Sequence, residues 1–123
     1  MDRILELGIR VTTQTGLNYN LGGTDANTGP MSPFVAMWTD VTRQTRVGVI
    51  GKTQAVTPLE PLKMHTIWAA EVMGDGAIKG TIELGKLADL AVLDRNPLAI
   101  DEDEIKEIQA TMTIVDGKIV FER

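Results

Sequence analysis

Residues 78–93, with the sequence IKGTIELGKLADLAVL, set the fold class that we assign to this chain. From Ile78 onward the apolar residues follow a period of two, which is typical of β-strands. We expect strands at residues 80–82 and 88–93, with a turn at residues 84–86 between them. The pattern therefore predicts a unit of short strands that begins near residue 78.

The residues that follow extend this unit to the end of the chain. Residues 111–121 predict a β-hairpin, because Asp116-Gly117 separates two runs of alternating apolar residues. Residues 101–108 predict one short acidic helix or turn, with the negative residues at the amino-terminal end, where the helix dipole favours them. This acidic run is a solvated helix start rather than a calcium loop, because Lys106 stands where an EF-hand loop needs glycine.

Before residue 78 the apolar spacing is helical. Ser32-Pro33 is typical of a helix start, and we expect that helix to extend to Arg46. The sequence Thr57-Pro58-Leu59-Glu60 forms a capping box in front of a helix that should run to about Met73. The chain thus divides into residues 1–77 and residues 78–123.

The amino-terminal residues predict the end of a helix, closed by Gly8, and then a short strand at residues 9–13. A glycine-rich turn follows at Gly22-Gly23-Thr24-Asp25 and carries an acid at its tip. Asp25 is therefore a candidate site residue. The alternative is a plain turn acid, because Gly and Asp favour turns for backbone reasons alone.

Composition limits the possible functions. The chain has 123 residues, a formal net charge of −5 and no cysteine. A complete (β/α)₈ barrel needs about 250 residues, so this chain cannot be one. The negative net charge argues against nucleic-acid and anionic-membrane partners. The lack of cysteine excludes disulfides and thiol catalysis. With no leader or membrane-spanning run in view, we expect a cytoplasmic protein.

Four other side chains could belong to a site. His65, the single histidine, lies on an amphipathic helix. We expect it to be a packing residue, and a role as a ligand is the alternative. Trp38 and Trp68 occupy apolar helical positions, which favours packing over substrate stacking. Arg43 could face a substrate carboxylate, although a surface ion pair is the simpler interpretation.

Several of these segments together resemble the carboxyl-terminal part of the amidohydrolase superfamily, in its YtcJ-like branch. Residues 80–90 are similar to the superfamily sequence Gly-Ser-Ile-x-x-Gly-Lys-x-Ala-Asp-Leu, which is structural rather than catalytic. Gly22-Gly23-Thr24-Asp25 resembles the Gly-Ser/Thr-Asp motif that ends the eighth barrel strand. The other matching segments are residues 40–43, 54–60, 64–70 and 113–118.

The resemblance implies an α/β fold, namely the last strand and helices of a TIM barrel (1–77) followed by part of the flanking β-sandwich (78–123). It also implies a hydrolase of amide or cyclic-amide C–N bonds with a divalent metal, zinc in our expectation. Asp25 would bind that metal and act as the general base toward water. The other ligands, including a His-x-His pair, belong to earlier strands in the family, and a zinc site needs about three protein ligands. We therefore expect no metal on this chain by itself.

Two functions follow. The first is a fragment of a metal-dependent hydrolase for a small-molecule amide, inactive by itself. The alternative is a non-enzymatic binding or oligomerisation module derived from an amidohydrolase. In the family the sandwich also uses strands from the amino-terminal part, and an eighth barrel strand without its neighbours would present two unpaired edges. We expect the chain to form a homo-oligomer or to associate with the missing barrel segment.

Overall fold

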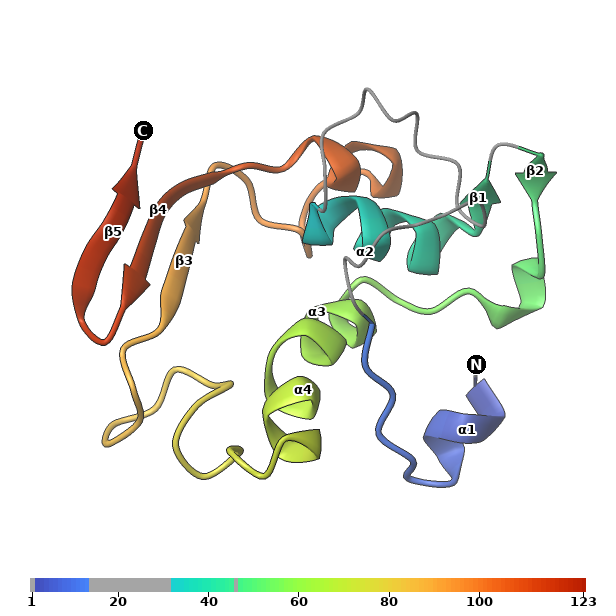
Figure 1. Ribbon diagram of the computed structural model, residues 1–123. Coiled ribbons are helices and arrows are strands. Elements are labelled where there is room, and N and C mark those ends of the chain that lie inside the picture. Colours follow the sequence, from blue (N-terminus) through green and yellow to red (C-terminus); the bar gives the residue numbers. More distant parts are fainter. Residues whose placement is uncertain (1, 14–31, 46) are drawn as a thin grey trace.

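The computed structural model describes residues 2–13, 32–45 and 47–123 and shows a mixed α/β chain. Short helices lie on one side of it and a three-stranded sheet on the other (Figure 1), and the described residues form no barrel. The helices are α1 (Asp2–Glu6), α2 (Pro33–Thr42), α3 (Leu59–His65) and α4 (Ile67–Val72), with 3₁₀ helices η1 (Lys52–Gln54) and η2 (Glu102–Glu107). The strands are β1 (Gln44–Thr45), β2 (Gly48–Val49), β3 (Leu90–Leu93), β4 (Ala110–Val115) and β5 (Lys118–Glu122).

Helix α2 begins as predicted but ends earlier. The Ser32 hydroxyl accepts a hydrogen bond of 3.3 Å from the N–H two residues further on, and Pro33 takes the first helical position. The expected extension to Arg46 is wrong. Arg43 adopts a left-handed conformation (φ 59°), and its N–H donates to the Thr39 carbonyl, which closes the helix.

The helix predicted to run to Met73 is divided into α3 and α4. Thr66 has φ −123° and ψ −101°, which lies outside the helical region and separates the two. At the start of α3 the capping box is half formed. The Glu60 carboxylate accepts hydrogen bonds from the Thr57 N–H (2.6 Å) and hydroxyl (2.9 Å), so this hydroxyl does not cap the helix.

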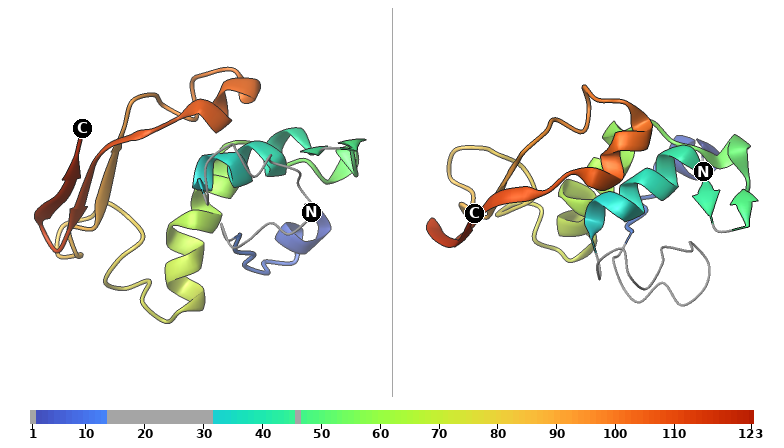
Figure 2. Two further views of the ribbon diagram at one scale, coloured as in Figure 1. Left: turned by 45° about the horizontal axis from the view of Figure 1, so that its top comes forward. Right: turned by 90° about the horizontal axis from the view of Figure 1, so that it is seen from above.

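The main apolar cluster of the described residues lies where α2 packs against η2. Met37 and Val41 from α2 meet Ile105 and Ile108 from the η2 segment, and each of these side chains is at most 4% exposed. Figure 2 shows α2 and η2 side by side, although they are far apart in the sequence. This packing joins the predicted unit 1–77 to the unit 78–123.

Strands β3, β4 and β5 form an antiparallel sheet in the order β3-β4-β5. The predicted hairpin is confirmed, because β4 and β5 pair across Asp116 and Gly117. Both turn residues have positive φ (51° and 74°), as a two-residue type I′ turn requires. The predicted acidic helix is also confirmed in its 3₁₀ form, and Asp101 caps η2 by accepting from the Asp103 N–H at 2.9 Å.

Two predicted strands are absent from the described residues. Residues 80–82 form no strand, because Gly80 (φ +95°) lies so close to α4 that a Cβ would be 2.9 Å from the Ile67 Cα. Residues 9–13 have no strand pairing either. Their side chains bind the helices instead, as Arg10 does in its 2.7 Å ion pair with Glu71.

Candidate functional site

Asp25 lies outside the described residues, and Thr13 is the last described residue before it. The Thr13 hydroxyl and His65 Nε2 are 2.9 Å apart and form a hydrogen bond. His65 is the last residue of α3, and the bond fixes residue 13 against this helix. The contact supports the packing interpretation of His65 given above.

Burial lowers the pKa of His65 below its ordinary value of 6.5. Its imidazole is therefore neutral at pH 7 and has one nitrogen that can accept and one that can donate a proton. The hydroxyl of Thr13 occupies Nε2, which leaves Nδ1 as the other polar atom of the ring. This arrangement could hold or pass a proton, but it contains no carboxylate partner among the described contacts of His65.

Asp40 on α2 is the most perturbed acid of the described residues. Burial raises the pKa of its carboxyl from 3.8 to about 6, and the nearby Arg43 guanidinium opposes this shift. Its Oδ2 atom is buried and has no hydrogen-bond partner. A buried acid that titrates near neutral pH is a typical feature of functional sites, although structural acids show it as well.

The sequence analysis did not select Asp40 as a site residue. One signal was available, because Asp40 follows Met37 by three residues and precedes Val41 directly, at the border of the apolar stripe of α2. An acid in that place is partly desolvated when the stripe packs. The size of the shift depends on the neighbouring elements, which the sequence does not give.

Replacing Asp40 with asparagine should stabilise the folded chain at pH 8 by about 1–2 kcal/mol and leave it unchanged near pH 4. The folded-state pKa is raised, so the wild-type carboxyl contributes stability below 3.8 that is lost as the pH rises through about 6. Urea unfolding at pH 4, 6 and 8 measures this directly. Glu102→Gln, an exposed acid, is the matched control, and an equal gain at pH 8 from both substitutions would contradict the assignment.

Among the described residues Arg43 forms no ion pair within 4 Å, although its charge acts on the nearby Asp40. Its Nε donates to the Ile50 carbonyl at 3.3 Å, which ties the end of α2 to the segment after β2. The side chain thus stabilises a chain reversal next to Asp40. Nothing in the described contacts aims it at a substrate carboxylate.

Both tryptophans pack as predicted, with cations over their rings. The Lys106 ammonium lies 4.5 Å from the ring centre of Trp38, whose indole N–H donates to Asp103 at 3.3 Å. Arg10 lies 5.4 Å from the ring centre of Trp68. Trp38 therefore joins α2 to η2, and Trp68 joins α4 to residue 10.

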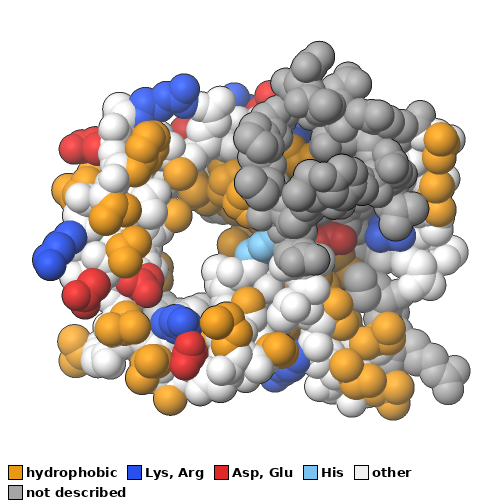
Figure 3. Space-filling view, in the orientation of Figure 1, with side chains coloured by type: hydrophobic (Ala, Val, Ile, Leu, Met, Phe, Trp, Pro, Cys, Tyr) orange, Lys and Arg blue, Asp and Glu red, His pale blue; other side chains and the backbone are white. Residues whose placement is uncertain are grey.

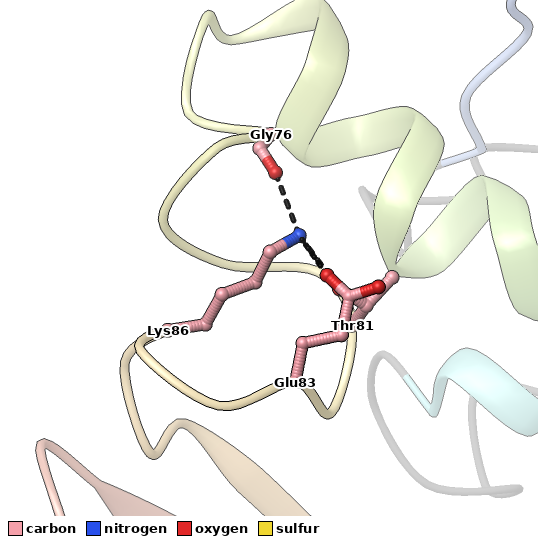
Figure 4. Close-up of polar contacts among 4 residues, drawn as sticks. All are labelled: Gly76, Thr81, Glu83 and Lys86. Carbon is pink, nitrogen blue, oxygen red and sulfur yellow. Dashed lines mark hydrogen bonds and ion pairs between the residues drawn. The ribbon is translucent and has the colours of Figure 1, made fainter.

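The Gly-Lys signature forms a small polar cluster that holds the loop between α4 and β3 (Figure 4). The Lys86 ammonium donates to the Gly76 carbonyl at 2.8 Å and to the Thr81 hydroxyl at 2.6 Å, and it pairs with Glu83 at 3.0 Å. The hydrogen bond from Lys86 also lowers the pKa of Glu83. The Lys86 side chain is 13% exposed, so it acts inside this loop and is closed to a ligand.

Within residues 2–13, 32–45 and 47–123, no three His, Asp or Glu side chains come close enough together to hold a metal ion. His65 Nε2 is engaged by the Thr13 hydroxyl, and Asp40 has no second His, Asp or Glu with it in a group that could hold a metal ion among the described residues. The described residues therefore do not fit the divalent metal that the resemblance implies. In the same part of the chain, no helix is long and apolar enough to cross a membrane.

Comparison with known proteins shows which family the chain is in. The family model described as "Amidohydrolase family" matches residues 9–121. An N-substituted formamide deformylase of Arthrobacter pascens is 40% identical over 116 residues, which is 94% of this chain and 21% of the relative. YtcJ of Bacillus subtilis (strain 168), which carries the name of an amidohydrolase, is 27% identical over 106 residues, 83% of this chain and 20% of the relative.

A solved amidohydrolase structure is similar in fold to most of this chain. The crystal structure of an amidohydrolase from Thermotoga maritima MSB8 superposes with a TM-score of 0.54 at 24% identity, over 74% of this chain and 19% of that one. The chain thus spans about a fifth of the length of the relatives that it matches. This 123-residue chain belongs to the amidohydrolase family and corresponds to a part of its longer members.

Proposed function

We propose that this chain supplies the carboxyl-terminal part of a metal-dependent hydrolase that cleaves a C–N bond of a small-molecule amide. The observation that carries the proposal is the 40% identity, over 94% of the chain, to a relative whose name is N-substituted formamide deformylase. An N-substituted formamide is accordingly the first substrate to test. Residues 1–77 would complete the barrel and residues 78–123 its flanking sandwich.

In this proposal Asp25 is the catalytic carboxylate that the chain contributes. It lies inside the span matched by the family model, and a carboxylate beside a reacting water can take its proton. It would also be the one metal ligand of this chain, with zinc as the expected ion. The remaining ligands would come from the associated barrel segment.

A chimeric enzyme tests the proposal. The matched segment of the Arthrobacter pascens deformylase is replaced by this chain, and amine release from an N-substituted formamide is measured. We expect turnover within about a hundredfold of the parent, since a misplacement of about 1 Å at a site can have that effect. A soluble chimera that binds the parent's amount of metal and has no turnover would contradict the proposal and favour the non-enzymatic module.

A cytoplasmic location and the absence of nucleic-acid partners stay predictions from the composition. The net charge of −5 supports the second, because nonspecific nucleic-acid binding needs clustered positive charge. Retention of the purified chain on heparin at low salt would be evidence against it.

A further inference from the structure

We propose that His65 is a positioning residue of the hydrolase: through its hydrogen bond to Thr13 it fixes the end of the chain that leads to Asp25. The proposal rests on the proposed function and adds to it a residue that touches neither the metal nor the amide. Asp25 remains the catalytic carboxylate of this chain, and His65 acts on it only through Thr13.

Side chains of α3 and α4 hold residues 10–13 in place. Glu71 on α4 forms an ion pair of 2.7 Å with Arg10. His65, at the end of α3, lies 2.9 Å from the Thr13 hydroxyl. Arg10 thus meets the later helix and Thr13 the earlier one, so this part of the chain runs antiparallel to α3 and α4.

The two links differ in strength. The side chains of Arg10 and Glu71 are 48% and 39% exposed, and water weakens such an ion pair. The bond between Thr13 and His65 is half-buried, and Figure 3 shows the single histidine, in pale blue, next to the opening between the helices and the sheet. Because a polar atom withdrawn from water costs free energy when it loses its partner, the Thr13 link holds the chain more firmly.

A hydrogen bond fixes Thr13 more narrowly than packing does. Apolar contacts are non-directional, whereas a hydrogen bond weakens steeply when its length or angle changes. The Nε2 atom of His65 therefore sets the place of one atom of residue 13. A side chain of similar volume without a polar atom at that place would fill the same space and lose this control.

The place of residue 13 bears on catalysis because the chain continues from it to Asp25. Thr13 is the last described residue before Asp25, and Ser32, which caps α2, is the first described residue after it. Fixing both ends of a connecting segment lowers the number of conformations open to it. A general base must lie within hydrogen-bond reach of the proton that it takes, and a misplacement of about 1 Å can cost about a hundredfold in rate.

Steady-state kinetics of the chimeric enzyme tests the proposal. Thr13→Val removes the hydroxyl and keeps the shape, and it should lower kcat about ten- to a hundredfold with KM changed less than about threefold. His65→Asn should have the same effect, because its shorter side chain does not reach the position of Nε2. The double variant should fall no further than either single variant, since both substitutions remove the same bond.

Conservative substitutions separate positioning from packing. Thr13→Ser keeps the hydroxyl, and His65→Gln places an amide group near the position of Nε2, so both should retain kcat within about threefold. Glu71→Gln is the matched control, because it removes the more exposed link of the same part of the chain, and it should change kcat less than about threefold. Zinc content and melting temperature identify the folded variants, and if one pair of variants does not fold, the other pair decides.

The proposal is overturned if turnover is the same in all variants, if both members of a pair lose it equally, or if Glu71→Gln has as large an effect as Thr13→Val. A loss that falls on KM alone overturns it as well. Failure of the proposed function gives a different result, because the chimera with the unsubstituted chain is then inactive and the positioning role falls with it. An active chimera that is insensitive to Thr13→Val removes the positioning role of His65 and leaves the proposed function intact.

Discussion

The Asp25→Asn substitution should lower the turnover of the chimeric hydrolase by about a hundred- to ten-thousandfold, the range typical of a lost general base. The amide of asparagine cannot take a proton from water, yet it has almost the shape of the carboxylate. The loss should therefore fall on kcat more than on KM. Steady-state kinetics with an N-substituted formamide measures both constants.

The matched control is Asp75→Asn in the same chimera. Asp75 forms a half-exposed ion pair of 2.7 Å with Lys79, and ion pairs near the surface contribute little to stability. Its substitution should change turnover less than twofold. If the two variants lose activity equally, or if neither loses it, Asp25 is not the catalytic carboxylate and the plain-turn interpretation is the better one.

The Ile105→Ala substitution should lower the free energy of unfolding by about 2–4 kcal/mol. Ile105 is 0% exposed and lies in the cluster of Met37, Val41 and Ile108 that joins α2 to η2. Its truncation leaves a cavity at the contact between the two parts of the chain. Because total stabilities of small domains are about 5–15 kcal/mol, the variant should melt many degrees lower.

Ile82→Ala is the control for this measurement. Ile82 is 87% exposed, so removing its side chain opens no cavity and should change the stability by less than about 0.5 kcal/mol. Urea unfolding followed by circular dichroism, at one fixed protein concentration, compares both variants with the wild type. Equal stabilities of Ile105→Ala and wild type would show that α2 and η2 do not share a core.

Local sequence signals predicted those elements whose ends are set by neighbouring residues. Ser32 at the start of α2, Asp116-Gly117 in the hairpin and Asp101 before η2 all act through backbone groups two or three residues away. Such contacts are present in the sequence itself. The start of α2, the hairpin turn and the start of η2 therefore lie where the sequence predicted them, whereas α2 ends earlier than predicted.

Other elements depend on distant partners, and there the sequence was insufficient. Residues 80–82 have the spacing of a strand, but Gly80 lies against α4 and the loop is held by Lys86. Residues 9–13 have strand-forming composition, but a strand needs a neighbour to pair with. In the described residues Arg10 and Thr13 bind side chains of α4 and α3 instead.

The candidate site shows the same limit. Asp25 was chosen because Gly22-Gly23-Thr24-Asp25 resembles a family motif, and a sequence motif can be recognised without knowledge of the fold. Asp40 was missed, because its raised pKa comes from burial between elements that the sequence does not place. The hydrogen bond of His65 to Thr13 spans 52 positions and likewise could not be read from a local pattern.

Amine release from an N-substituted formamide by the purified 123-residue chain, with zinc added and no other polypeptide present, is the decisive assay. A chain that needs the remainder of an amidohydrolase for chemistry should give no release above the buffer rate, while the chimera turns over. Release that rises in proportion to the concentration of the isolated chain and disappears with Asp25→Asn would show that these residues suffice for hydrolysis.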